Sequence, residues 1–72
     1  MSNWALYSLD DGERICVKSY AASADSLKTL AVRAYKEWGY VFPFVIVSPL
    51  GVDMFRCDGE TKTGRFKRWQ WL

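Results

Sequence analysis

One segment of the chain has the spacing of an amphipathic helix: ADSLKTLAVRAYKEW, residues 24–38. Its apolar residues recur every three or four positions and share one helical face: Ala24, Leu27, Leu30, Ala31, Ala34, Tyr35 and Trp38. Ser23 precedes the segment as an N-cap, Asp25 suits the positive end of the helix dipole, and Gly39 suits the helix end. The pattern predicts one helix of about four turns, with Tyr35 and Trp38 packed in the core.

Shorter segments on both sides of this helix are typical of strands. Residues 4–9 and 13–20 flank Asp10, Asp11 and Gly12, which predict a tight hairpin turn. Residues 44–48, 52–57 and 65–72 follow the helix. The order ββαβββ predicts an α+β fold in which a single amphipathic helix packs on one face of a small antiparallel sheet. A chain of 72 residues has room for one domain, residues 1–72.

One helix leaves the second face of such a sheet without a covering layer. The apolar residues available to the strands are enough for both faces: Trp4, Leu6, Val45, Val47, Phe55, Trp69 and Trp71. We expect some of them to face a partner, because contiguous exposed apolar surface usually marks an interaction site. The alternatives are that long side chains such as Lys18 and Arg56 cover this face, or that the sheet curls on itself.

The residue inventory argues against catalysis. The chain has no histidine, which removes the commonest general base and metal ligand. Cys16 and Cys57 are too few for a zinc site and are expected to be buried, reduced thiols, with a disulfide between them as the alternative. We therefore expect no catalytic residue, no metal and no cofactor. No run approaches the ~20 apolar residues of a membrane span, and no signal peptide is visible, so a cytoplasmic protein is expected.

Basic charge is concentrated near the C-terminus. The net charge of the chain is +2, whereas residues 60–72 hold four cations, Lys62, Arg65, Lys67 and Arg68, against Glu60 alone. Residues 61–72 interleave these cations with Phe66, Trp69 and Trp71, and a bulge near Arg68 would place Phe66 and Trp69 together in the core. Three interpretations stay open: an edge strand guarded by charge, a surface for an acidic protein, or a platform for single-stranded nucleic acid.

Candidate partner-binding residues follow from the types that interfaces favour, which are aromatic side chains and arginine, with basic neighbours. They are Tyr7, Arg56, Arg65, Lys67, Arg68, Trp69 and Trp71. A monomer is favoured over a twofold homodimer, because Lys67 and Arg68 would repel their symmetry mates across an antiparallel edge.

The chain resembles the small proteins with which bacteriophages disable host machinery. The likeness rests on small size, one amphipathic helix on a small sheet, a lack of catalytic groups and a surplus of aromatic residues. Anti-CRISPR proteins that cap a type I surveillance complex are similar in scale and layout, as are phage inhibitors of bacterial RNA polymerase. The resemblance covers the whole chain as architecture and carries over no functional residue.

That resemblance implies a non-catalytic inhibitor that binds a larger host protein or nucleoprotein complex and blocks its surface, in the cytoplasm of a bacterial cell. Many such inhibitors are acidic mimics of nucleic acid, and the mildly basic charge of this chain argues against mimicry. The alternative function, from the residues themselves, is binding of single-stranded nucleic acid through residues 61–72.

Overall fold

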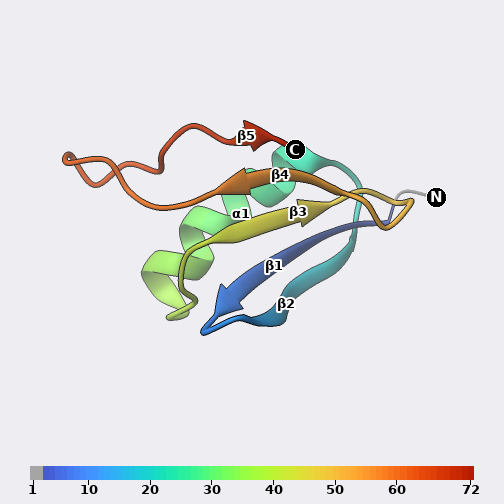
Figure 1. The fold of residues 1–72 in the computed structure, drawn as a ribbon, viewed down its shortest axis with the longest axis horizontal. Coiled ribbons are helices and arrows are strands. Elements are labelled where there is room, and N and C mark those ends of the chain that lie inside the picture. The colour runs from blue at the N-terminus through green and yellow to red at the C-terminus, as the bar shows by residue number, and fades with distance from the viewer. Residues whose placement is uncertain (1–2) are drawn as a thin grey trace.

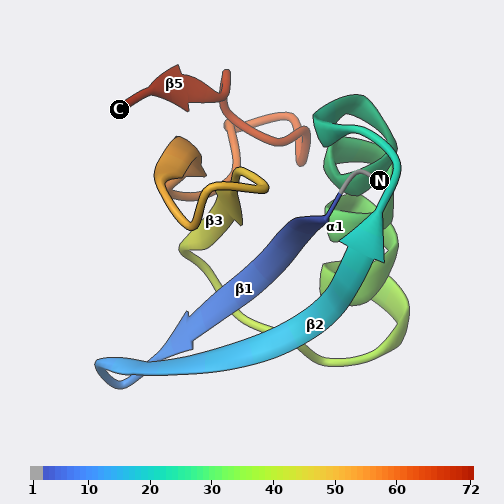
Figure 2. The ribbon, with the colours of Figure 1, turned by 90° about the vertical axis from the view of Figure 1, so that its right-hand side faces the viewer.

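The computed structural model describes residues 3–72, whose arrangement is drawn in Figure 1. The elements are β1 (Trp4–Asp10), β2 (Glu13–Ala21), α1 (Ala24–Glu37), β3 (Phe44–Val47), β4 (Asp53–Cys57) and β5 (Gln70–Trp71). The five strands of this part of the chain form an antiparallel sheet in the order β2-β1-β3-β4-β5, and α1 lies against one of its faces (Figure 2). The predicted α+β fold and its order ββαβββ are confirmed.

The local signals at the helix and the hairpin are confirmed. Asp11 and Gly12 connect β1 and β2 with φ angles of 52° and 82°, which is the left-handed geometry of a two-residue hairpin turn. At the start of α1, the backbone N–H of Ser26 donates to the hydroxyl oxygen of the N-cap Ser23, at 3.3 Å. Gly39 follows the helix with a φ of 77°, a conformation that glycine adopts without strain.

The prediction for Trp38 is wrong. The helix ends at this residue, whose backbone N–H still donates to the carbonyl of Ala34. Its ring is 51% exposed and lies 5.6 Å from the guanidinium carbon of Arg33, outside the core. Tyr35, one turn earlier, does pack against the core, as predicted. A residue at the cap no longer follows the helical repeat, which is why the apolar stripe ends before Trp38.

The main core lies between α1 and the sheet. Its buried members are Leu6, Ala21, Leu27, Ala31, Ala34, Phe44, Ile46 and Phe55. Burying one such leucine or phenylalanine side chain contributes about 1.5–3 kcal/mol of transfer free energy. This core faces only one side of the sheet, so the fold depends on how the other side is protected.

A smaller apolar cluster lies on the second face of the sheet. Ala5, Val45 and Val47 are only 7%, 1% and 8% exposed, although no helix lies over them. Arg14 of β2 reaches Asp53 of β4 with two hydrogen bonds of 3.0 and 2.9 Å, and its guanidinium carbon lies 5.4 Å from the centre of the Tyr7 ring. Figure 2 shows the strong curl of the β1–β2 hairpin that accompanies this closure.

The expectation that this face exposes apolar residues is therefore wrong. Of the seven strand residues considered for it, only Trp71 is more than half exposed. Tyr7 and Leu9 pack against the buried residues of this face. Of the two long side chains named as alternatives, Arg56 lies on this face beside Val45, and Arg14, which was not named, bonds to Asp53 across it. The remaining exposed apolar surface has to be sought elsewhere.

The predicted strand over residues 65–72 is also wrong in extent. Regular pairing is confined to Gln70 and Trp71, with one isolated bridge between Glu60 and Phe66. Residues 58–69 form a long irregular segment that projects from the end of β4 (Figure 1). Its mixed alternation of cations and aromatic rings offers no purely apolar face, so a strand there would gain little by burial.

Cys16 and Cys57 are both free and differ in environment. Cys57 is buried as predicted, whereas Cys16 is exposed on the edge strand β2, against expectation. Within residues 3–72 we find no helix long and apolar enough to cross a membrane.

Candidate binding groove

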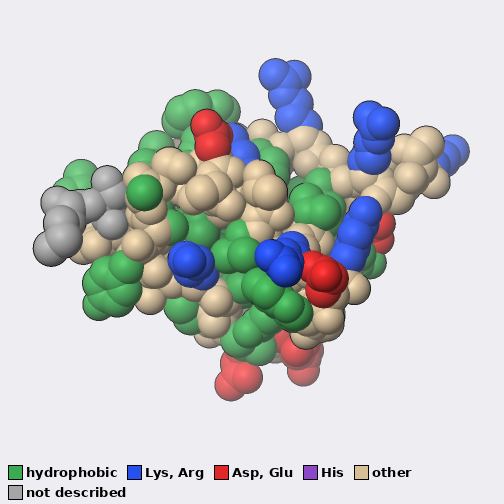
Figure 3. Space-filling view, turned by 180° about the vertical axis from the view of Figure 1, so that it is seen from behind, with side chains coloured by type: hydrophobic (Ala, Val, Ile, Leu, Met, Phe, Trp, Pro, Cys, Tyr) green, Lys and Arg blue, Asp and Glu red, His purple; other side chains and the backbone are tan. Residues whose placement is uncertain are grey.

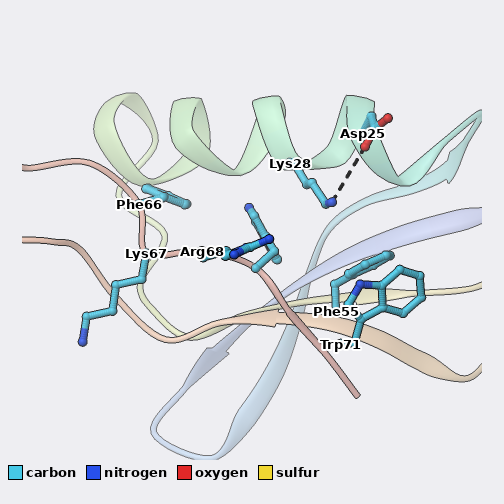
Figure 4. Close-up of a pocket in the computed structure, with 8 residues that line it drawn as sticks. Asp25, Lys28, Phe55, Phe66, Lys67, Arg68 and Trp71 are labelled. Carbon is cyan, nitrogen blue, oxygen red and sulfur yellow. Dashed lines mark ion pairs between the residues drawn. The ribbon is translucent and has the colours of Figure 1, made fainter.

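A groove of about 540 Å³ opens between α1 and the C-terminal segment (Figure 4). Its lining comes from the first turns of the helix, from β4 and from the segment that leads into β5: Asp25, Lys28, Phe55, Phe66, Lys67, Arg68, Trp69 and Trp71. Four of these residues are aromatic, three are cationic and one is acidic. The groove combines an apolar lining with an excess of positive charge.

Phe66 fixes the irregular segment to the body of the protein. Its ring lies near those of Tyr35, Phe42 and Phe44, with centroid distances of 5.9, 4.7 and 5.8 Å. This cluster belongs to the main core, so the segment is held by the same packing that holds the helix. Phe66 and Trp69 both pack against the core, as the sequence predicted, although an irregular path rather than a strand bulge brings them there.

Hydrogen bonds complete this attachment. The Tyr35 hydroxyl donates to Glu60 Oε1 at 2.5 Å, and this interaction raises the pKa of Tyr35 above its ordinary value. The Cys57 thiol donates to the backbone carbonyl of Lys67 at 3.2 Å, while the Lys67 N–H donates to the Gly59 carbonyl at 2.9 Å. Burial raises the pKa of Cys57, so the thiol remains protonated and keeps its role as a donor. The base of the segment is thus fastened on both sides.

Phe55 and Trp71 form the aromatic end of the groove. They are paired residues of β4 and β5, with ring centroids 4.6 Å apart and an interplanar angle of 54°. Lys28 of α1 places its Nζ 4.3 Å from the centre of the Phe55 ring, within the range of a cation–π interaction. Phe55 is buried, whereas Trp71 is 73% exposed because β5 is the edge of the sheet. Trp71 is the open aromatic surface of the groove.

Two cations approach the groove from opposite sides. Figure 4 shows Lys28 descending from the helix and Arg68 extending toward the helix from the C-terminal segment, while Lys67 points away from the groove. Lys28 has one carboxylate nearby, with its Nζ 3.8 Å from the Oδ1 of Asp25, whose side chain is 92% exposed. So loose and exposed a pair neutralises little of the positive charge.

The irregular segment, residues 58–69, carries exposed cations, and we call it the basic segment. Within the described range 3–72, ion pairs involve Arg14, Lys28, Arg33 and Arg56, but none of the four cations of the segment: Lys62, Arg65, Lys67 and Arg68. All four are exposed. Figure 3, which looks at the helix side, shows basic side chains standing out along this projection. The projection and the groove together form one positively charged surface, which we call the basic face.

The predicted partner-binding residues fall on two separate surfaces. Four of the seven line the groove, namely Lys67, Arg68, Trp69 and Trp71, and Arg65 lies on the projecting segment beside it. Tyr7 and Arg56 lie instead on the opposite face of the sheet, joined through Val45 in one row of paired residues. The Nε of Arg56 also donates a hydrogen bond to Oδ1 of Asp58, at 2.6 Å.

Sequence reasoning missed the helix side of the groove. Asp25 and Lys28 belong to the polar face of α1, which the helical pattern assigns to solvent. From the sequence, Phe55 is one of the apolar residues of the strands and Phe66 is placed in the core, and neither is named as a partner-binding residue. The spacing of Asp25 and Lys28 places both on one side of the first turn, but nothing in the sequence says that the C-terminal segment lies opposite them. Among residues 3–72, no group of three or more His, Cys, Asp or Glu residues is arranged to hold a metal ion.

Comparison of the chain with models of protein families, with curated proteins and with solved structures finds no match. The fold and the basic face are therefore the basis for any statement about function.

Proposed function

We propose that this chain is a small non-catalytic inhibitor that binds an acidic surface of a larger protein or nucleoprotein complex through its basic face. One observation carries the proposal: within residues 3–72, the four cations Lys62, Arg65, Lys67 and Arg68 are exposed and form no ion pair, and two of them, Lys67 and Arg68, belong to the same groove as the exposed ring of Trp71. Tryptophan and arginine are the residues that contribute most to protein–protein affinity, and a basic rim steers an acidic partner into place.

Anchoring of the basic segment supports a binding role. Its cations are presented from a backbone held by Phe66, the Cys57 thiol and the Tyr35–Glu60 hydrogen bond. Preorganised side chains lose less conformational entropy when a partner binds. A purely solubilising run of charges needs no such attachment, so the attachment favours recognition.

The architectural resemblance to phage inhibitors supports the biological side of the proposal. Such proteins act by occupying a surface that a host complex needs, and a single rigid face is sufficient for that purpose. In this view the basic face covers an acidic region of a bacterial protein that handles nucleic acid. The inhibition is steric and electrostatic, and no bond in the partner is broken.

Single-stranded nucleic acid is the second candidate, because cations beside an exposed tryptophan also suit phosphates and a base. A sequence-tolerant platform uses several open rings in succession. Of the three aromatic residues in residues 61–72, Phe66 and Trp69 are turned partly into the core, and Trp71 alone is mostly exposed. This arrangement favours the protein partner.

Affinity capture from bacterial lysate tests the proposal. The tagged chain should retain one stoichiometric protein, and a triple variant, Arg65→Ala, Lys67→Ala and Arg68→Ala, should lose it. A control variant, Lys18→Ala with Lys36→Ala, removes two exposed positive charges elsewhere and should retain the protein. Absence of any stoichiometric partner, or equal retention by both variants, would contradict the proposal. Retention of nucleic acid alone would favour the second candidate.

A further inference from the structure

We infer that the groove between α1 and residues 66–71 is the seat for one extended acidic segment of the partner, with an acidic residue next to an aromatic one. This inference rests on the proposed function and assigns the chemistry of the contact. The carboxylate would lie between Lys28 and Arg68, and the aromatic side chain would pack on Trp71.

The charge of the groove favours a carboxylate. Lys28 and Arg68 enter from opposite walls, so their two positive charges repel each other. Asp25 forms an ion pair with Lys28 and not with Arg68. Asp25 is largely exposed and lies at the limit of an ion pair. A bound carboxylate accepts hydrogen bonds from both cations and replaces their mutual repulsion with attraction. The guanidinium of Arg68 suits a planar carboxylate in particular, because it can donate two parallel hydrogen bonds.

The aromatic end sets the second requirement. Phe55 is already contacted by Lys28 on its ring and by Trp71 beside it, at 4.3 and 4.6 Å. The exposed surface of Trp71 is the part that remains available for a ligand ring. One open ring next to one pair of cations fits a single acidic residue and a single aromatic neighbour.

The location of the groove suits an extended chain. It lies beside β5, which is the edge strand and pairs through only two residues, Gln70 and Trp71. One side is bounded by the helix and the other by residues 66–69, and the volume of about 540 Å³ is suited to a few side chains.

A synthetic peptide of alternating glutamate and phenylalanine, labelled with a fluorophore, is the probe. Its binding to the full chain is measured by fluorescence anisotropy at low and moderate salt. Lys28→Gln and Arg68→Gln remove the two charges and leave a polar side chain, while Lys36→Gln makes the same change on α1 outside the groove. Each groove variant should weaken binding about fivefold, the double variant more, and Lys36→Gln should be close to the parent chain.

Trp71→Leu keeps an apolar side chain and removes the indole, and should weaken the same peptide. The indole signal of Trp71 in an amide correlation spectrum should shift with peptide, and the remaining signals establish that each variant is folded. A peptide of alternating lysine and phenylalanine should not bind. Binding that is equal in Lys36→Gln and Arg68→Gln, or absent altogether, would overturn the inference, as would tight binding of oligothymidylate with no binding of the acidic peptide.

The two proposals fail separately. If the chain captures a protein through its basic face but does not bind the acidic peptide, the proposed function stands and the inference about the groove is wrong. If the chain binds the peptide but captures no protein, the inference about the groove stands and the proposed function is wrong.

Discussion

Truncation of Phe66 to alanine should loosen the basic segment and destabilise the whole domain. The ring is partly buried, and it packs on Tyr35, Phe42 and Phe44. Losing the burial of a phenylalanine costs about 1.5–3 kcal/mol when the ring is fully enclosed, and each well-placed aromatic pair adds about 0.5–1.5 kcal/mol. Because Phe66 is only partly enclosed, we expect a loss of about 2–4 kcal/mol.

That loss is large for this chain. A domain of 72 residues has a free energy of unfolding of roughly 4–10 kcal/mol. The Phe66→Ala variant should therefore unfold roughly 10–25 °C below the parent chain. Urea unfolding followed by circular dichroism measures the free energy, and a thermal scan measures the midpoint.

Phe66→Leu is the matched control. Leucine keeps most of the apolar burial and removes the ring contacts, so the loss should be about 1–1.5 kcal/mol. Under conditions where Phe66→Ala is still folded, the amides of residues 61–68 should exchange faster with solvent while those of β1 and β3 remain protected. A Phe66→Ala variant within about 0.5 kcal/mol of the parent chain would refute the role of Phe66 as the anchor.

Three further outcomes are expected. Cys16 should react with a thiol reagent in the folded protein and Cys57 only after unfolding in urea, because Cys57 is buried and its pKa is raised; equal rates would contradict this. Arg14 lowers the pKa of Asp53, so this carboxylate stabilises the fold at pH values above the unfolded value of about 3.9 and ceases to do so as the pH falls through the lower folded value. Asp53→Asn should therefore be less stable than the parent at pH 7, with the gap closing below about pH 4 in urea titrations. Sedimentation at two concentrations should give a mass of 8.3 kDa, since β2 carries two register shifts and β5 is two residues long, and both features resist strand addition; a stable mass twice as large would contradict it.

The parts of the fold that were predictable are those specified by local sequence. The helix follows from its apolar spacing and from Ser23, and the β1–β2 hairpin follows from Asp11 and Gly12. In both cases residues within one or two turns of each other carry the signal. The strand β3 is also recognisable, because its residues Phe44–Val47 form a continuous aromatic and β-branched run, and β4 follows it after the turn signal of Pro49 and Gly51.

Long-range contacts determine the parts that were missed. On the second sheet face, Tyr7 and Leu9 pack on Val45 and Val47. Arg14 bonds there to Asp53, 39 positions away in the chain, and neither contact leaves a pattern in the sequence. Five of the seven proposed partner-binding residues lie on or beside the basic face, since that cluster is contiguous in sequence. Lys28 and Asp25 were missed because only the tertiary fold brings the first turns of α1 opposite the C-terminal segment.

The irregular path of residues 58–69 explains how one short segment serves both the core and the groove. In a regular strand, Phe66 and Arg68 would point to one face of the sheet while Trp69 and Trp71 pointed to the other. All four instead line the same groove. Without regular strand pairing, the backbone polar groups of this segment need other hydrogen-bond partners. For Lys67, the Cys57 thiol donates to the carbonyl and the Gly59 carbonyl accepts from the N–H. The loss of strand structure therefore lets Phe66 enter the core while Arg68 faces the helix, and the basic face depends on that departure.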